Sequence, residues 1–158
     1  MFDLFNFSYA KLASFVAIND VQKTYFKKKY ISFINPEYIK FVEDKDGNLV
    51  AFAIVMPSFS IALQKAKGKL FPFGLFHLLN ARKNSKDVTF YLIGVHPDYQ
   101  NKGVHAIIFK EYYTTFIKKG IQNCIRTPEL ADNLAIQLLW KNFDPKIICR
   151  RKTFIKNL

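Results

Sequence analysis

Cysteine is scarce in this sequence, and the two cysteines lack the spacing of a metal site or a disulfide framework. Cys124 and Cys149 lie far apart in apolar, strand-like segments, which favours buried free thiols in a reducing compartment. We therefore predict a cytoplasmic protein without a bound metal. Long hydrophobic runs are missing too. The longest, Leu49–Leu63, is broken by Pro57 and is shorter than the roughly 20 residues that cross a bilayer. We expect no membrane span and, because no basic and then apolar segment opens the chain, no signal peptide.

Acidic residues are half as frequent as basic ones, 12 Asp and Glu against 24 Lys and Arg, which gives a formal net charge of +12. Such a charge favours a polyanionic partner: nucleic acid, an anionic membrane surface or a phosphorylated cofactor. The basic residues are dispersed, however. Only Lys27–Lys29 and Arg150–Lys152 form runs of three, and no RNA-binding aromatic motif accompanies them. We expect no nucleic-acid partner, and nucleic-acid binding remains an alternative that rests on charge alone.

Apolar residues make up half of the chain, and 17 Phe and 8 Tyr are among them. This composition excludes a disordered chain, and 158 residues suit one domain with one core. The order of the expected elements predicts an α/β fold, a mixed sheet with helices packed on it, as a single domain over residues 1–158. These elements are helices over Leu4–Ile18 and Val21–Phe33, a hairpin of Tyr38–Glu43 and Leu49–Met56, a strand over Val88–Val95, a helix over Val104–Lys119, a strand over Ile121–Arg126, a helix that starts between Thr127 and Asp132 and ends at Pro145, and a strand over Lys146–Ile155.

Residues 57–87 form a helical insert between the hairpin and the next strand. Two helical stretches, Ser58–Lys67 and Leu75–Arg82, flank the helix breakers Gly68 and Pro72–Gly74. Three interpretations stay open: short helices packed on the core, a lid over a substrate pocket, or a hairpin that touches a membrane. The insert carries an apolar patch beside three lysines; the residues are Phe71, Phe73, Phe76, Leu78 and Leu79 with Lys65, Lys67 and Lys69.

The most informative segment joins the strand Val88–Val95 to the helix that follows. It reads Ile-Gly-Val-His-Pro-Asp-Tyr-Gln-Asn-Lys-Gly-Val-His over residues 93–105, so that a short loop with Pro97 turns and Gly103 opens the helix. Such a connection points several backbone N–H groups into one space at the positive end of a helix dipole, which suits a pyrophosphate. A side chain at Gly103 would keep phosphate oxygens away from the backbone.

In this segment the chain resembles the GNAT superfamily of acyl-CoA-dependent N-acyltransferases. The signature of that family is Gln or Arg, two residues, Gly, one residue, and Gly or Ala, after a central strand and at the start of a helix. Gln100 and Gly103 match it, and so does the preceding Val-x-Pro-x-Tyr at residues 95–99. Downstream, Asn133 opens the next helix and Trp140 follows seven residues later, where family members often have Asn and then Leu-Tyr. The likeness covers residues 38–156. Residues 63–76 and 92–103 also resemble the C-terminal half of longer bacterial GNAT-like proteins.

The resemblance implies a site for acetyl-CoA or another acyl-CoA as co-substrate. The strands Val88–Val95 and Ile121–Arg126 would part at one end, and the pantetheine arm would enter the gap. The pyrophosphate would lie on the N–H groups at the start of the helix, with the Lys102 ammonium nearby. The implied cofactor-binding residues are Ile93, Gly94, Val95, Gln100, Asn101, Lys102, Gly103, Val104, His105 and Asn133.

Three departures from the family bear on catalysis. His105 stands where the signature has a small residue, so its side chain must point aside or crowd the phosphates. Trp140 stands where many members have a tyrosine that protonates the leaving thiolate, which an indole cannot do. The strand Val88–Val95 has no glutamate to serve as a base, and His96 is the nearest side chain of a type that titrates near neutrality. His96 is therefore the candidate catalytic residue, against the alternative of a histidine without a catalytic role.

Together with the resemblance, the sequence predicts an N-acyltransferase, in the first place an N-acetyltransferase, that acts on the amine of an unidentified small molecule or peptide. The alternative is a catalytically weak or inactive GNAT-fold module that binds acyl-CoA or a partner, which the three departures favour. The family usually begins with a strand, and here the chain enters a helix by Leu4. Without that first strand, we expect an open sheet edge at Tyr38–Glu43 or Leu49–Met56, and with it a homodimer or a missing N-terminal domain.

Overall fold

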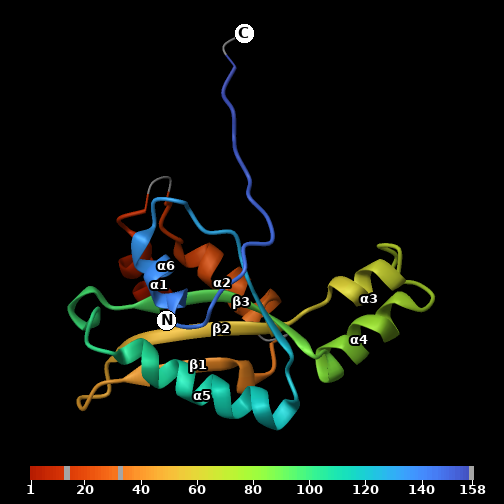
Figure 1. Cartoon of the computed structure of the whole chain (residues 1–158), viewed down its shortest axis with the longest axis horizontal. Helices are drawn as coiled ribbons and strands as arrows, with labels where there is room; N and C mark the ends of the chain where they lie inside the picture. The colour runs from red at the N-terminus through yellow and green to blue at the C-terminus, as the bar shows by residue number, and fades with distance from the viewer. Residues whose placement is uncertain (13–14, 32–33, 157–158) are drawn as a thin grey trace. The chain divides into compact units, whose positions relative to one another are not determined.

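The computed structural model describes residues 1–12, 15–31 and 34–156. The chain divides into two compact units, Met1–Thr127 and Pro128–Leu158. The first unit holds a β-sheet with its covering helices, and the second holds a single described helix (Figure 1). That the two units form one domain over residues 1–158 stays a prediction.

The first unit is built on a four-stranded mixed sheet with the strand order β1-β2-β3-β4. β1 (Ile39–Glu43) and β2 (Leu49–Pro57) form the expected antiparallel hairpin. β3 (Asp87–Val95) runs antiparallel to β2, and β4 (Asn123–Arg126) runs parallel to β3. The predicted mixed α/β sheet is confirmed.

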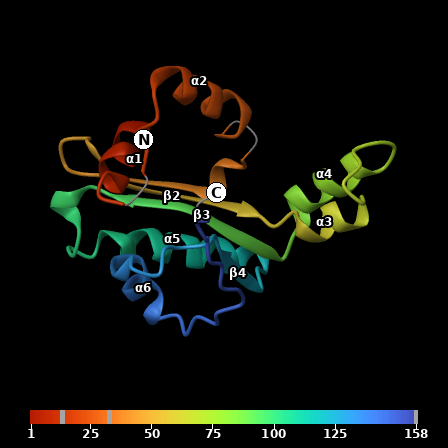
Figure 2. The ribbon, with the colours of Figure 1, turned by 90° about the horizontal axis from the view of Figure 1, so that it is seen from above.

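Helices cover both faces of this sheet (Figure 2). α1 (Phe2–Tyr9) packs against β2 and β3, and α2 (Asp20–Lys29) lies on the same side. α5 (Val104–Lys119) packs against β1 and β2 on the other side. β2 is therefore buried on both faces, which explains why its sequence is a continuous apolar run without the alternation of a half-exposed strand. Its fully buried residues are Ala51, Phe52, Ala53 and Val55.

Tyr112 ties α5 to the sheet. Its side chain is buried, and its hydroxyl donates to the carbonyl oxygens of Tyr38 at 2.9 Å and Ala53 at 2.8 Å. Burial raises the pKa of Tyr112 far above its ordinary value, because a phenolate would be desolvated there. The hydroxyl therefore stays protonated and serves as a fixed donor in the core.

We expect Tyr112→Phe to lower the free energy of unfolding by about 1–3 kcal/mol, because two buried carbonyl oxygens lose a donor. The matched control is Tyr113→Phe, since the neighbouring Tyr113 is 69% exposed and such a change is usually within about 0.5 kcal/mol. Urea unfolding of the two variants measures the difference. Equal stabilities would contradict a structural role for the Tyr112 hydroxyl.

The two N-terminal helices are shorter than predicted. α1 ends at Tyr9, not at Ile18, because the side chain of Asn6 binds the backbone N–H and carbonyl of Ile18 at 2.9 and 3.1 Å and holds the returning chain beside the helix. α2 is capped by Asn19 in a capping box with Gln22. The expected cap, Asp20, is the first residue of α2. Parts of both predictions, residues 13–14 and 32–33, lie outside the described residues.

The insert over residues 57–87 contains two helices, as expected: α3 (Ser60–Lys65) and α4 (Gly74–Asn84). They pack on each other as a hairpin that extends away from the sheet (Figure 2). Gly74 makes this packing close, because a Cβ at that position would lie 1.8 Å from the carbonyl oxygen of Lys69. The prediction of two short helices is confirmed, and most of their large apolar side chains remain exposed.

The second unit contains α6 (Leu134–Lys141), whose N-cap is Asn133. The predicted start between Thr127 and Asp132 is therefore wrong by a few residues. The predicted strand over Lys146–Ile155 is also wrong, since the described residues 142–156 form neither helix nor strand. β-propensity alone does not make a strand, because the backbone needs a neighbour to pair with.

β1 is one of the two edge strands of the described sheet, and β4 is the other. Within the described ranges, β1 pairs on one side only, whereas β2 pairs with both β1 and β3. Of the two alternatives expected for the open edge, residues 39–43 provide it and residues 49–56 do not. A homodimer or an N-terminal partner at this edge stays a prediction. Light scattering over a concentration series tests the dimer, and a monomer at the highest concentration would contradict it.

Two further expectations concern the surface. Cys124 and Cys149 are both exposed, so the prediction of buried thiols is wrong; Cys124 lies on the edge strand β4, which has a neighbour on one side only. Within the described ranges, no helix has the length and hydropathy needed to cross a bilayer.

Candidate functional site

The parallel strands β3 and β4 part halfway along β3. Their ladder pairs Asp87 to Phe90 with Asn123 to Arg126 and stops there. The chain leaves β4 at Thr127, whose N–H donates to the carbonyl of Phe90 and whose hydroxyl donates to that of Tyr91. A β-bulge lies at the same level, because Leu92 faces Ile54 while Phe90 faces Val55. Bulges increase the local twist of a strand, and beyond this one β3 continues to Val95 paired with β2 alone.

The strand register decides which backbone groups of β3 point into this opening. The N–H of His96 donates to Val50 in β2, and Gly94 lies opposite Phe52. In an antiparallel ladder the N–H and C=O of one residue point to the same side, and consecutive residues alternate. Gly94 therefore directs its backbone groups to β2. Ile93 and Val95 point theirs away from β2, toward the side that β4 has left.

Two hydroxyl groups of α1 donate hydrogen bonds to the carbonyl oxygens of Ile93 and Val95. Tyr9 donates to Ile93 at 2.9 Å, and Ser8 donates to Val95 at 3.2 Å. Gly94 permits this contact by lacking a side chain, since a Cβ there would lie 2.4 Å from the Phe52 ring and 3.1 Å from the Ser8 hydroxyl. The opening is thus lined by α1 on one side and by the free half of β3.

The turn after β3 ends in an uncapped helix. A short 3₁₀ helix, Pro97–Tyr99, leads to Asn101 and Gly103, which have φ of 61° and 75°. No side chain in the described part of the chain caps α5, so the first N–H groups of the helix are left to a ligand or to solvent. Gly103 is needed for its positive φ. The space around it is open, since a Cβ added to Gly103 would meet nothing within 4 Å.

The side chains of this turn leave the helix terminus accessible. The amide of Gln100 folds back and donates to the carbonyl of Val95 at 3.3 Å. The Lys102 ammonium lies over the ring of Tyr99, 5.3 Å from its centre. The ring of His105 packs edge-on against Phe109, one turn further along α5, with 6.4 Å between the ring centres. His105 therefore points aside, which is one of the two outcomes that its bulk allowed.

His96 lies beside Asp98 and two aromatic rings. Its Nδ1 accepts the backbone N–H of Asp98 at 3.3 Å, and the Asp98 carboxylate lies further away, at 3.7 Å. The shorter contact uses Nδ1 as a hydrogen-bond acceptor. The ring also lies beside Phe7 of α1 and Tyr99. These contacts describe the cap of the 3₁₀ helix, and a role of His96 as a base stays a prediction.

A hydrogen bond joins the turn after β3 to the hairpin of β1 and β2. The hydroxyl of Tyr99 donates to the Asp44 carboxylate at 3.1 Å. The backbone N–H of Asn48, together with the side chains of Asn48 and Tyr99, holds the pKa of Asp44 below its ordinary value. In turn, the hydrogen bond to Asp44 raises the pKa of Tyr99. Both groups keep their charge states at neutral pH, so this link fixes the turn across the physiological range.

Two candidate residues lie in the second unit. Asn133 caps α6, with its side-chain oxygen 3.4 Å from the N–H of Ile136. Trp140 is buried, and its indole N–H donates to the Glu129 carboxylate at 2.9 Å. A contact of Asn133 with a cofactor stays a prediction. The indole of Trp140 serves as a hydrogen-bond donor within its own unit.

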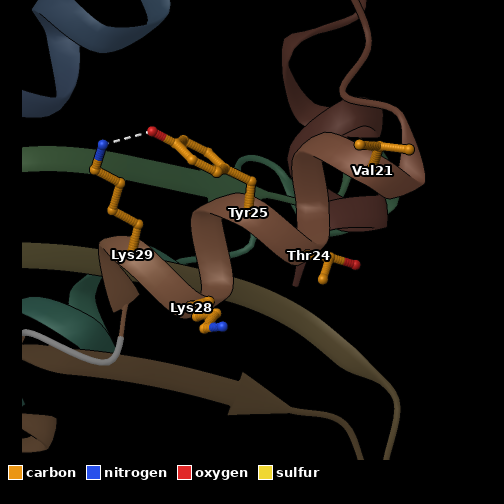
Figure 3. Close-up of a pocket in the computed structure, with 5 residues that line it drawn as sticks. All are labelled: Val21, Thr24, Tyr25, Lys28 and Lys29. Atoms are coloured by element: carbon orange, nitrogen blue, oxygen red, sulfur yellow. Dashed lines mark hydrogen bonds between the residues drawn. The ribbon is translucent and has the colours of Figure 1, made fainter.

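A hollow along α2 does not form a site. Its lining comes from one helix, and Figure 3 shows Tyr25 and Lys29 pointing toward one another while Lys28 points elsewhere. The Lys29 ammonium donates to the Tyr25 hydroxyl at 2.6 Å, which lowers the pKa of Tyr25 and raises that of Lys29. These groups lie at the surface and satisfy each other's hydrogen bonds, so neither is left for a ligand.

Comparison with known proteins tests the fold. No family model and no curated protein matches the sequence, but solved structures match it at low identity. A protein assigned as a phosphinothricin N-acetyltransferase aligns over 89% of this chain and 72% of its own, with 14% identity and a TM-score of 0.58. An aminoglycoside acetyltransferase from an uncultured soil metagenomic sample, solved with sisomicin, aligns over 99% and 84%, with 14% identity and a TM-score of 0.52. The PaiA N-acetyltransferase of Thermoplasma acidophilum, solved with coenzyme A, aligns over 89% and 76%, with 14% identity and a TM-score of 0.51.

The chain has the GNAT acetyltransferase fold. The predicted fold class is thereby confirmed, and the opening between β3 and β4 lies directly before the turn that carries the GNAT-like signature at Gln100 and Gly103. Within the described residues no strand precedes β1, in keeping with the expected lack of a first strand. Sequence reasoning missed Ser8 and Tyr9. No local signal identifies them, because their partners in β3 lie 87 and 84 residues away.

Proposed function

We propose that this protein is an acyl-CoA-dependent N-acyltransferase, with acetyl-CoA as the first co-substrate to test. The observation that supports the proposal is that the opening between β3 and β4 leads directly into the turn before α5. The β3–β4 ladder ends at Phe90, and the chain after β3 runs into the uncapped start of α5 at Gly103. An extended ligand with an anionic middle and a thioester end fits such a site. The three solved structures compared above are described as acetyltransferases, and one of them was solved with coenzyme A.

The geometry supports a specific set of residues as the ones that would hold the co-substrate. The N–H groups at Gly103, Val104 and His105 would receive the pyrophosphate at the positive end of α5. Lys102 can swing from the Tyr99 ring to the phosphates, since that cation–π contact is worth only about 0.5–1 kcal/mol at an exposed site. The pantetheine arm would run along Ile93, whose carbonyl oxygen can accept a second hydrogen bond beside that of Tyr9.

Direct transfer requires little from the protein beyond positioning the amine against the thioester. A neutral amine nitrogen attacks the thioester carbon, the C–N bond forms, the nitrogen loses a proton to water, the C–S bond breaks and the sulfur leaves as a thiolate that takes up one proton. Backbone N–H groups of Ile93 or Val95, which point into the opening, can stabilise the charge that develops on the carbonyl oxygen. Tyr9 is the hydroxyl nearest to this part of β3, and we propose it as the group that protonates the thiolate, in place of the tyrosine that Trp140 replaces.

A binding module without catalysis is the second candidate, and one observation favours it. Ser8 and Tyr9 already bind the carbonyls along which a pantetheine arm would lie. A rapid-quench experiment with excess protein over [¹⁴C]acetyl-CoA and a panel of amines separates the two candidates. A transferase consumes acetyl-CoA in an amine-dependent single turnover. Tight binding of acetyl-CoA with no transfer to any amine would favour the module.

A further inference from the structure

The hairpin of α3 and α4 carries a group of exposed apolar side chains. The side chains at its tip are among the most exposed large apolar groups in the described chain: Phe71 is 77% exposed, and Phe73 and Phe76 are 68% exposed. Single exposed apolar residues are ordinary on protein surfaces, but a contiguous group marks an interaction site. The exposed large apolar residues of the hairpin are Ile61, Leu63, Leu70, Phe71, Phe73, Leu75, Phe76 and Leu79.

Charge around this apolar group has one sign only. No Asp or Glu occurs between Asp46 and Asp87, and the insert over residues 57–87 carries six Lys and Arg residues, five of them within the hairpin. Lys65, Lys67 and Lys69 are exposed and lie within a few residues of the aromatic tip. An exposed surface of phenylalanine and leucine bordered by lysine, with no acidic residue, has the composition of elements that lie at the interface of an anionic bilayer. These basic residues are Lys65, Lys67, Lys69, Arg82, Lys83 and Lys86.

The position of the hairpin makes it available for such a surface. It extends away from the sheet, beyond the end of β2 and the start of β3 (Figure 2). The loop at its tip is held in one shape by its own backbone, with hydrogen bonds from Gly68 to Leu63 and from Leu75 to Leu70. Because the backbone of the tip is already ordered, binding has to order only its side chains.

Charge disfavours the other occupants that the chain offers at the hairpin. A second copy carries the same net charge of +12, so long-range repulsion opposes contact between two hairpins. The C-terminal segment, residues 142–156, has exposed apolar residues of its own but holds five basic residues against one acidic residue, Asp144. A basic segment and a basic hairpin repel each other, so charge disfavours this contact.

We propose that the α3–α4 hairpin docks on the surface of anionic lipid bilayers. Phe71, Phe73 and Phe76 lie at the boundary between the headgroups and the acyl chains, and Lys65, Lys67 and Lys69 contact the anionic headgroups. Neither helix has the length to cross a bilayer, so the hairpin lies in the interface. Docking brings an enzyme or a binding module to lipids, and the inference does not depend on the proposed acyl transfer.

Flotation of the full chain with vesicles tests this docking. Vesicles of phosphatidylcholine alone are compared with vesicles that contain about 30% phosphatidylglycerol, at about 0.1 M salt. We expect binding to the anionic vesicles and little to the neutral ones. Charge reversal at Lys65, Lys67 and Lys69 to Glu is expected to weaken the partition about tenfold or more. The matched control reverses Lys27, Lys28 and Lys29 on α2, which changes the net charge equally and should weaken partition less than about threefold.

The aromatic tip is tested by Phe71→Ser with Phe73→Ser. Loss of most binding to anionic vesicles is expected, because two large apolar groups leave the interface. The control pair is Phe154→Ser with Ile155→Ser, which are 88% and 97% exposed in the C-terminal segment and should change little. Unchanged circular dichroism shows that the variants fold.

Three results would overturn the proposal. The first is a lack of binding to anionic vesicles by the parent protein. The second is equal loss in the two lysine triples, which would assign binding to diffuse charge. The third is a dimer in sedimentation velocity, without vesicles, that only the Phe71 and Phe73 substitutions abolish; it would make a second copy the occupant.

Discussion

Replacing Gly103 by valine is expected to weaken the binding of coenzyme A tenfold or more, about 1.4 kcal/mol. Gly103 has a φ of 75° at the start of α5, a conformation that a β-branched residue avoids. The turn must therefore change shape, and the N–H groups that would meet the pyrophosphate move with it. Isothermal titration calorimetry of the parent and the variant measures the loss.

Two further variants separate the backbone effect from a simple loss of stability. Gly68→Val is the matched control, because Gly68 has a φ of 71° and the same open surroundings as Gly103 but lies in the α3–α4 hairpin; its affinity should stay within about twofold. Gly103→Asn keeps the positive φ, which asparagine tolerates, and adds a side chain to the site. Weaker binding in this variant would report crowding of the phosphates. An unchanged affinity in Gly103→Val would contradict the assignment of the site to this turn.

Tyr9→Phe is expected to slow a single turnover of acetyl transfer about 10²-fold, within the usual range for a general acid. The hydroxyl of Tyr9 lies on the carbonyl of Ile93, inside the opening between β3 and β4, and phenylalanine keeps the ring while removing the proton. The affinity for acetyl-CoA should change little. Ser8→Ala is the comparison, because its hydroxyl lies on Val95 and is assigned no proton transfer.

A change of leaving group distinguishes an acid from a structural hydroxyl. An aryl thioester such as S-acetyl 4-nitrothiophenol releases a thiolate that needs no proton. If Tyr9 is the acid, the deficit of Tyr9→Phe disappears with this substrate. A deficit that persists would mean that the hydroxyl only positions α1 against β3. A rate gain in Trp140→Tyr, with Tyr9→Phe unaffected, would instead place the acid where the GNAT resemblance puts it.

The sequence predicted the elements whose signals are local. The hairpin around Asp44–Asn48, the strand β3, and the helix α5 with its terminal glycines were all found within one or two residues. Gly120, for example, ends α5 with a φ of 63°, which is what a helix followed by glycine implies. Each of these signals depends on residues that are close in the chain, so a single sequence carries it.

Features that depend on distant contacts were not predicted. The end of α1 is set by the hydrogen bonds between Asn6 and Ile18. The apolar periodicity of the sequence predicted a helix that continues beyond Tyr9. The expected strand at Lys146–Ile155 lacks the neighbour that would have made it one. In the site, the sequence predicted Ile93, Gly94 and Val95 as cofactor-binding residues without distinguishing between them. The register with β2 shows that Gly94 directs its backbone N–H and C=O to β2 and away from the opening. Its lack of a side chain makes room for Ser8.

The central claim is that acyl-CoA binds between the opening of β3 and the start of α5. Titration of ¹⁵N-labelled protein with coenzyme A, followed by amide shifts, tests it most directly. The account predicts that the amides of Gly103, Val104 and His105 shift together with those of Ile93 and Val95, and that all saturate at one concentration. No saturable shift, or shifts gathered along α2 instead, would contradict it.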